Sequence, residues 1–324
     1  MMSSSPNVSV SSSSSKFGFS HPLLTEGYPP AVLEYESKQH LNKPMLLYLP
    51  GFDGTLVAPF LQFPELGTEF DVRGLSIDMS DRSTFYELRD GVINYIVSEL
   101  LDGDNGANAA TAPKSRPIYI LGESFGGILA SEVCLALQEH HPSINIGGLV
   151  LINPATSYTR SRLYVEAPPV SQMSMPFAYI AGLVKLLPLF ADSYQMPQLL
   201  MMLSSDALPS IIDTTAREAY MGRVAFSLAD KLKFMPREAL DWRLTSWLKD
   251  GCEIVTAERL KDLSKQRVLL VVGEVDEALP STDEAERLQS IISNSEVHIV
   301  DVSRERFIFI FKLQHALNSL TTKY

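Results

Sequence analysis

The chain is poor in cysteine and in positive charge. Its 324 residues include two cysteines, Cys134 and Cys252, whose separation fits neither a disulfide framework nor a cysteine-rich zinc site. Lysine and arginine together number 27 against 38 acidic residues, which gives a formal net charge of −11, and no run is rich in Lys and Arg. This balance argues against binding to nucleic acid, because phosphates attract basic surfaces.

Long apolar runs are also missing. The most apolar stretch, residues 176–190, is interrupted by Lys185 and Pro188 and is shorter than a membrane span. No spacing of histidine and aspartate matches a metal-ligand set, so we expect neither a metal nor any other cofactor. The length suits one large domain or two small ones and is sufficient to bury a substantial core.

The amino terminus is rich in serine. Residues 1–20 contain no acidic residue and a single lysine, Lys16. Such a segment buries too little apolar surface to offset the entropy lost on ordering, and we expect residues 1–37 to be disordered. The composition also fits an organelle transit segment, although the usual arginines are missing. Both interpretations are consistent with the sequence.

Short apolar runs alternate with longer stretches of helical periodicity. Strands that are buried on both faces of a parallel sheet have this apolar character. The predicted strands are 45–49, 74–77, 118–121, 149–152, 268–272 and 297–302, and the predicted helices are 83–101, 125–139 and 283–292, the first with Asp81 and Ser83 as candidate N-caps. The alternation predicts an α/β fold with a mainly parallel sheet.

The alternation stops after residue 153. The sequence then keeps a helical periodicity without a convincing strand until residue 265. An insertion of this size at the carboxyl end of a sheet strand is typical of a lid over a site. We therefore expect an α/β core formed by residues 38–153 and 266–324, with a helical lid over residues 154–265.

A serine lies in the motif G-x-S-x-G at residues 122–126, between an apolar strand and a helical stretch. In this context the motif is typical of a nucleophile at a sharp strand-to-helix turn. Such a turn strains the backbone of Ser124, and only glycine at positions 122 and 126 avoids clashes with neighbouring elements. The hydroxyl would lie at a helix N-terminus, which favours a developing negative charge. Ser124 is the predicted nucleophile, and a glycine-rich corner without chemistry is the alternative.

A second glycine-rich turn, Gly51-Phe52-Asp53-Gly54, follows the predicted strand 45–49. Hydrolases with a G-x-S-x-G turn bind the oxyanion with two backbone N–H groups, one after an early strand and one from the residue after the nucleophile. We predict Phe52 and Phe125 as these donors. Gly51 and Gly54 would allow close approach of the backbone, and Asp53 would hold the turn by hydrogen bonds. An ordinary Gly-Asp turn is the alternative.

Three carboxylates follow the predicted strand 268–272, namely Glu274, Asp276 and Glu277. An acid at the carboxyl end of a strand after the insertion fits the chain order of serine, acid and histidine. We favour Asp276, which would orient the imidazole and stabilise imidazolium. Glu274 and Glu277 remain competitors, and a solvated acidic turn is the alternative interpretation.

Two histidines follow Asp276 along the chain. His298 lies inside the last predicted strand, whereas His315 lies at the start of a predicted terminal helix. We select His315 as the candidate general base and keep His298 as its competitor. If neither serves, the chain has no catalytic histidine and the serine is a poor nucleophile.

Methionine is concentrated in the predicted lid, which holds seven of the eleven. Flexible, polarizable thioethers suit a wall that adapts to a long acyl chain, although ordinary helix packing is the alternative. The seven are Met173, Met175, Met196, Met201, Met202, Met221 and Met235.

Four segments are informative together: LYLPGFDGT (47–55), LGESFGG (121–127), LINPATS (151–157) and VVGEVDEALPSTDEAERL (271–288). In order and spacing they resemble, over about residues 40–300, the plastid phytyl ester synthase and diacylglycerol acyltransferase group of the esterase/lipase/thioesterase family. The resemblance implies an α/β-hydrolase that passes an acyl group from a lipid or acyl thioester to phytol or diacylglycerol in a plastid. It also implies Ser124 as nucleophile, Asp276 as acid and the turn at 51–54 as oxyanion loop. Peripheral contact of the lid with a membrane or lipid droplet is a further expectation.

The sequence departs from that group in two respects. No histidine has an aspartate five positions later, as the H-x4-D motif of a glycerolipid acyltransferase domain requires, and no Gly-His pair follows the last predicted strand. We expect the carboxyl end to be truncated or mis-spliced. The acyl group is expected to pass either to the lipid alcohol or to water. The alternative function is that of a catalytically impaired lipid-binding protein with the same fold.

Overall fold

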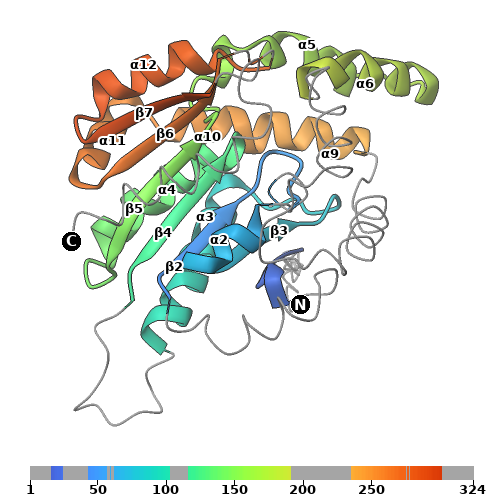
Figure 1. Ribbon diagram of the computed structural model, residues 1–324. Helices are drawn as coiled ribbons and strands as arrows, with labels where there is room; N and C mark the ends of the chain where they lie inside the picture. The colour runs from blue at the N-terminus through green and yellow to red at the C-terminus, as the bar shows by residue number, and fades with distance from the viewer. Residues whose placement is uncertain are drawn as a thin grey trace, which may run out of the picture.

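The computed structural model describes residues 16–24, 43–56, 59, 62–102, 116–190, 235–274, 276 and 278–300. These residues form a seven-stranded sheet with the order β1-β3-β2-β4-β5-β6-β7 (Figure 1). β1 is antiparallel to β3, and the other neighbours are parallel. The strands are β1 (Phe17–Ser20), β2 (Met45–Leu49), β3 (Asp71–Ile77), β4 (Ile118–Glu123), β5 (Ile146–Ile152), β6 (Val268–Gly273) and β7 (Ser295–Val300). The predicted α/β fold is confirmed, and each of the six predicted strands overlaps one of β2 to β7.

Helices cover the sheet and explain why its strands are apolar. All five residues of β2 and the first five of β4 and β6 are buried. The α-helices are α2 (Phe63–Glu69), α3 (Phe85–Val97), α4 (Phe125–His140), α5 (Arg162–Ser171), α6 (Pro176–Phe190), α9 (Arg237–Trp242), α10 (Asp250–Ile254), α11 (Ala257–Leu260) and α12 (Ser281–Ile291). Two π-helical segments, η3 (Ser98–Asp102) and η6 (Arg243–Lys249), and three short 3-10 turns, η1 (Pro22–Leu24), η4 (Tyr158–Arg160) and η7 (Lys261–Lys265), complete the described elements.

Helix α4 lies at the centre of the molecule. It packs on β2, β4 and β5, and it is covered in turn by α3, α10 and η6. Every residue from 125 to 137 is therefore buried. A helix enclosed on all sides provides a rigid support for whatever stands at its first turn.

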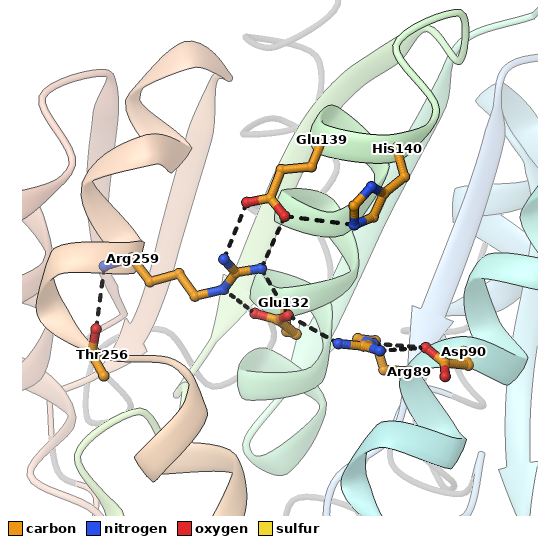
Figure 2. Close-up of polar contacts among 7 residues, drawn as sticks. All are labelled: Arg89, Asp90, Glu132, Glu139, His140, Thr256 and Arg259. Carbon is orange, nitrogen blue, oxygen red and sulfur yellow. Dashed lines mark hydrogen bonds and ion pairs between the residues drawn. The ribbon is translucent and has the colours of Figure 1, made fainter.

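A buried carboxylate ties α4 to two other helices (Figure 2). Glu132, which is 1% exposed, accepts hydrogen bonds from Nε and Nη2 of Arg259 at 2.7 and 2.9 Å. Arg89 of α3 lies 3.5 Å from the same carboxylate, and Arg259 also donates to Glu139 at 3.1 Å. The hydrogen bonds with Glu132 raise the pKa of Arg259, so this guanidinium stays charged. The network fixes α4 against α3 and α11.

The prediction of disorder over residues 1–37 is wrong for part of that segment. Residues 17–20 form β1, an edge strand that extends the sheet beyond β3. Phe19 stacks on Tyr95 of α3 with ring centroids 4.0 Å apart, and Phe17 lies in the space left by Gly91, where a Cβ would meet its ring at 2.4 Å. Phe17 and Phe19 thus supply apolar burial that the serine-rich composition of residues 1–20 did not lead us to expect. Residues 1–15 and 25–42 lie outside the described residues.

The predicted N-caps of α3 are also wrong. Thr84 caps this helix: its hydroxyl accepts the N–H of Glu87 at 3.3 Å, and the Glu87 carboxylate accepts the N–H of Thr84 at 2.7 Å. Asp81 is buried and accepts hydrogen bonds from the N–H groups of Lys16 and Ser83. Several residues near the helix start are able to cap, and the reciprocal pair selects Thr84.

The described part of the predicted lid, residues 154–190 and 235–265, contains helices and no strand. α5 and α6 lie next to one another at the top of the molecule in Figure 1. Met173 and Met235 pack against the core and Met175 is 66% exposed, whereas Met196, Met201, Met202 and Met221 lie outside the described residues. Among the described helices, none is both long and apolar enough to cross a membrane.

Candidate active site

Ser124 stands at the sharp bend between β4 and α4. Its backbone has φ 53° and ψ −114°, a conformation that costs a residue with a side chain roughly 1–3 kcal/mol. Hydrogen bonds hold this strain in place: its N–H donates to Ile152 O at 2.9 Å, and its carbonyl accepts the N–H groups of Gly127 and Ala155 at 2.9 and 3.0 Å. The side chain of Ser124 makes no capping hydrogen bond to the helix, and the residue is partly exposed. The bend therefore presents the hydroxyl at the first turn of α4.

The two motif glycines are required by close backbone contacts. A Cβ at position 122 would lie 2.1 Å from the carbonyl oxygen of Gly126. A Cβ at position 126 would lie 2.1 Å from the carbonyl oxygen of Leu49 and 2.7 Å from that of Pro50. These neighbours are backbone atoms that cannot move aside independently. The same contacts bring the start of α4 against the segment that follows β2.

The turn Gly51–Gly54 lies beside Ser124. A point where a Cβ of Gly51 would stand is 3.8 Å from Ser124 Cβ and 3.3 Å from Asp53 Oδ1. The N–H of Gly54 donates to Gly51 O at 2.9 Å, and Gly54 has φ 71°, a left-handed conformation that favours glycine. In a trans peptide the C=O and N–H point in opposite directions, so this bond directs the Phe52 N–H away from the interior of the turn.

The second predicted donor, Phe125, is the first residue of α4. The first N–H groups of a helix have no intrahelical acceptor and carry a partial positive charge. The Phe125 ring is fully buried and stacks on Trp247, with centroids 4.9 Å apart and planes inclined by 20°. The backbone at this position is therefore fixed by packing of its own side chain.

Two partly buried carboxyl groups, those of Glu123 and Asp53, lie near the bend. Tyr48 donates a hydrogen bond to Glu123 Oε2, and Thr55 donates to Asp53 Oδ2. Burial raises the pKa of Glu123 to about 7, which the hydrogen bond from Tyr48 opposes and the charge of Asp53 reinforces. Burial also raises the pKa of Asp53, against the hydrogen bond from Thr55 and the charge of Arg243. Sequence reasoning assigned Asp53 to the turn and gave Glu123 no role, although a carboxylate next to the motif serine in an apolar strand was a usable signal.

The predicted acid lies in the loop after β6. Asp276 Oδ1 accepts the N–H groups of Ala278 and Leu279 at 2.9 and 3.0 Å, and Oδ2 accepts the hydroxyl of Ser281. These bonds shape the loop, and ionised carboxylate oxygens have room for a further donor. Of the competitors, Glu274 is exposed and Glu277 lies outside the described residues.

The ends of β4, β5 and β6 are brought to one edge of the sheet. Gly122 pairs with Leu151, Ile152 pairs with Val271, and Asn153 Oδ1 accepts the N–H of Gly273 at 2.9 Å. Asn153 has φ 39°. Among the described residues, Asn153 and Ser124 are the two non-glycine residues with a positive φ. Since neighbouring strands lie about 4.8 Å apart, β4 and β6 are separated by roughly 10 Å. This separation suits an imidazole between the two loops.

The described residues do not place a histidine between those loops. His298 lies within β7 opposite Val271, and its Nε2 is buried without a hydrogen-bond partner among the described residues. His315, the candidate base, lies in the segment 301–324, outside the described residues. No group of three or more His, Cys, Asp or Glu in the described part of the chain could hold a metal ion.

The largely parallel sheet and the bend at Ser124 define the α/β-hydrolase fold, and solved structures agree. The enol-lactonase from Burkholderia xenovorans LB400 matches 86% of this chain and 93% of its own at 14% identity and a TM-score of 0.56. An esterase from Rhodococcus sp. ECU1013 matches 86% and 92%, at 13% identity and a TM-score of 0.53. At these identities the likeness establishes the fold.

Two plant proteins are similar to this chain in sequence. Phytyl ester synthase 1, chloroplastic, from Arabidopsis thaliana is 31% identical over 265 residues, which cover 79% of this chain and 33% of that protein. Phytyl ester synthase 2, chloroplastic, from the same plant is 37% identical over 118 residues, or 36% of this chain and 15% of that protein. The chain thus spans about a third of the length of the first relative, and no family model matches it. The resemblance inferred from the four sequence segments is confirmed.

Proposed function

We propose that this chain is a serine acyl-enzyme catalyst that acts on lipid esters or acyl thioesters and transfers the acyl group to a lipid alcohol, phytol or diacylglycerol, or to water. The observation that carries the proposal is the strained Ser124, with φ 53°, placed beside the Gly51–Gly54 turn at the N-terminus of a buried helix. A strained bend maintained by so many contacts is typical of a functional site. The names of the two plant relatives support phytol as acceptor and the plastid as compartment.

In the proposed reaction Ser124 Oγ attacks the acyl carbonyl carbon and its proton passes to a histidine, for which His315 remains our candidate. The N–H groups of Phe52 and Phe125 stabilise the oxyanion of the tetrahedral intermediate, and Asp276 orients the imidazole and stabilises imidazolium. Collapse of the intermediate expels the alcohol or thiol, which takes the proton from the imidazolium, and leaves an acyl-serine. Phytol, diacylglycerol or water then attacks this ester and regenerates Ser124.

The lipid nature of the substrate is supported by an apolar surface on α5 and α6. Large apolar side chains that face solvent are Val165 of α5, Met175 just before α6, and Phe177, Ile180 and Val184 of α6, which are 44–86% exposed. Phe177, Ile180 and Val184 are three and four positions apart and therefore share one face of α6, and an exposed apolar face marks contact with lipid or with another protein. We propose that this part of the predicted lid contacts the lipid phase from which the substrate comes.

A fluorophosphonate probe tests the proposed nucleophile. The wild-type protein is expected to be labelled covalently, and Ser124→Ala to lose all labelling. Ser290→Ala, which removes an exposed serine on α12, is the control and should be labelled like the wild type. Wild-type protein that remains unlabelled, or labelling that survives Ser124→Ala, would reject the proposal.

A second candidate function is lipid binding without turnover by the same fold. It is favoured by the position of His298 inside β7, where the strand backbone keeps it out of the loop in which a general base is expected. This candidate predicts saturable binding of a fatty acid together with no ester hydrolysis. Measured turnover that Ser124→Ala abolishes would exclude it.

A further inference from the structure

One arginine joins the predicted oxyanion turn to the end of β3. Arg243, the first residue of η6, is fully buried. Its Nη1 donates to Phe52 O at 2.8 Å, and its Nη2 donates to Asp78 O at 3.0 Å and to Ile77 O at 3.4 Å. The planar guanidinium can hold three carbonyl oxygens at fixed angles, which a lysine ammonium on a flexible stem does not reproduce. The carbonyl that follows the predicted Phe52 donor is therefore fixed in direction.

The same guanidinium also packs against Gly54 at the end of the turn. Its Nη1 lies 3.2 Å from the point where a Cβ of Gly54 would stand, and the N–H of Ile77 donates to Gly54 O at 2.8 Å. Burial lowers the pKa of Arg243 to about 10, and the charge of Asp53 opposes this shift, so the side chain is protonated at neutral pH. When its acceptors move away, a charged buried donor loses much more hydrogen-bond free energy than a neutral donor does.

Arg243 also contacts Trp247, whose ring packs on Phe125, the second predicted donor. Its guanidinium carbon lies 4.4 Å from the centroid of the Trp247 ring, and Trp247 stacks on Phe125. The indole N–H of Trp247 donates to Ser83 O at 2.8 Å, which fixes the ring. One turn of a π-helix thus contacts the residues of both predicted oxyanion donors, and π-helical turns are frequent at functional sites.

We propose that Arg243 is a positioning residue that sets the oxyanion turn and, with Trp247, links the carboxyl-terminal part of the helical insertion to both backbone donors. The inference rests on the proposed function, because it assumes that an oxyanion forms between Phe52 and Phe125. It goes beyond that function because it names a residue outside the predicted triad that fixes the position of the backbone donors which bind the oxyanion in the transition state.

The test compares Arg243→Met and Arg243→Lys with the matched control Arg259→Met, which removes the ion pairs of α11 at a distance from the bend. With a short p-nitrophenyl ester, Arg243→Met should lower kcat per folded molecule about 100-fold and leave KM within about twofold, since a displaced oxyanion donor acts on the transition state. Arg243→Lys should recover part of kcat. Arg259→Met should lose thermal stability and keep kcat.

Hydrogen exchange provides a readout that does not need turnover. The N–H of Gly54 should exchange about tenfold faster in Arg243→Met and Arg243→Lys than in the wild type, while the amides of β2 stay protected. Unchanged kcat per folded molecule in Arg243→Met, or unchanged exchange at Gly54 in both variants, would overturn the inference. If Arg243→Met does not fold, Arg243→Lys decides by the same two criteria. A wild type that is not labelled by the probe would reject the proposed function, whereas the exchange result would still show whether Arg243 holds the turn.

Discussion

Replacing Gly126 by alanine should displace Ser124. The new Cβ would lie 2.1 Å from Leu49 O and 2.7 Å from Pro50 O, although real Cβ contacts essentially never fall below 3.0 Å. Because the neighbours are backbone atoms in a close-packed core, the start of α4 must move by about 1 Å. A misplacement of this size costs about 100-fold in rate, and overpacking costs about 1–3 kcal/mol of stability. We therefore expect kcat/KM for a short acyl ester to fall about 100-fold and the free energy of unfolding to fall as well.

The matched control is Gly273→Ala at the end of β6, where a Cβ would meet nothing within 4 Å. Ester hydrolysis and urea unfolding are measured on both variants and the wild type. The sign of the stability change is informative, because alanine inside a helix is otherwise favoured over glycine by about 1 kcal/mol. If Gly126→Ala is as active as Gly273→Ala and more stable than the wild type, the steric argument for the bend is refuted.

Two further predictions concern one partly buried carboxylate, Glu123, and one buried carboxylate, Glu132. Since burial raises the pKa of Glu123 from 4.5 to about 7, the folded protein keeps a proton that the unfolded chain releases, so the free energy of unfolding should fall by about 3 kcal/mol as the pH rises from 4.5 to 7. Glu123→Gln should remove most of this dependence in urea titrations at several pH values, whereas the exposed Glu274→Gln should keep it; an unchanged slope in Glu123→Gln contradicts the shift. Glu132→Ala should destabilise the protein by about 3 kcal/mol, because it leaves two arginines without their shared partner, and the more exposed Glu139→Ala by about 1 kcal/mol or less. If urea unfolding shows the same loss of stability in Glu132→Ala and Glu139→Ala, the burial of Glu132 does not account for its contribution to stability.

The predicted strands were found because burial on both faces leaves a local trace. β2, β4 and β6 read as continuous apolar runs, and each lies between helices in the structure. β1 was missed since its four residues (FGFS) carry only two apolar side chains, and their partners Tyr95 and Gly91 are more than seventy positions away along the chain. A strand stabilised by distant contacts is not visible in its own composition.

The supports of the candidate site were less predictable than its motif. Ser124 and its two glycines form a local pattern, because a bend between a strand and a helix involves neighbours in sequence. Arg243 and Trp247 attracted no functional prediction: a polar and an aromatic residue in a helical stretch are compatible with many packing arrangements. The role proposed for them rests on contacts with Phe52 and Phe125, which fold topology alone brings near them.

By itself, the amino-acid order determined that this chain alternates apolar strands with helices, that a serine stands between two obligatory glycines at one such junction, and that the chain resembles phytyl ester synthases. These features are local or repeated, so periodicity and spacing express them. Only the tertiary structure decided that the carboxyl groups of Asp53 and Glu123 lie close enough for the charge of one to raise the pKa of the other, and that one guanidinium contacts the neighbouring turn. The reason is physical: pKa shifts, close backbone approach and fixed carbonyl directions arise from groups that are far apart in the chain and meet only when the sheet and its helices have packed.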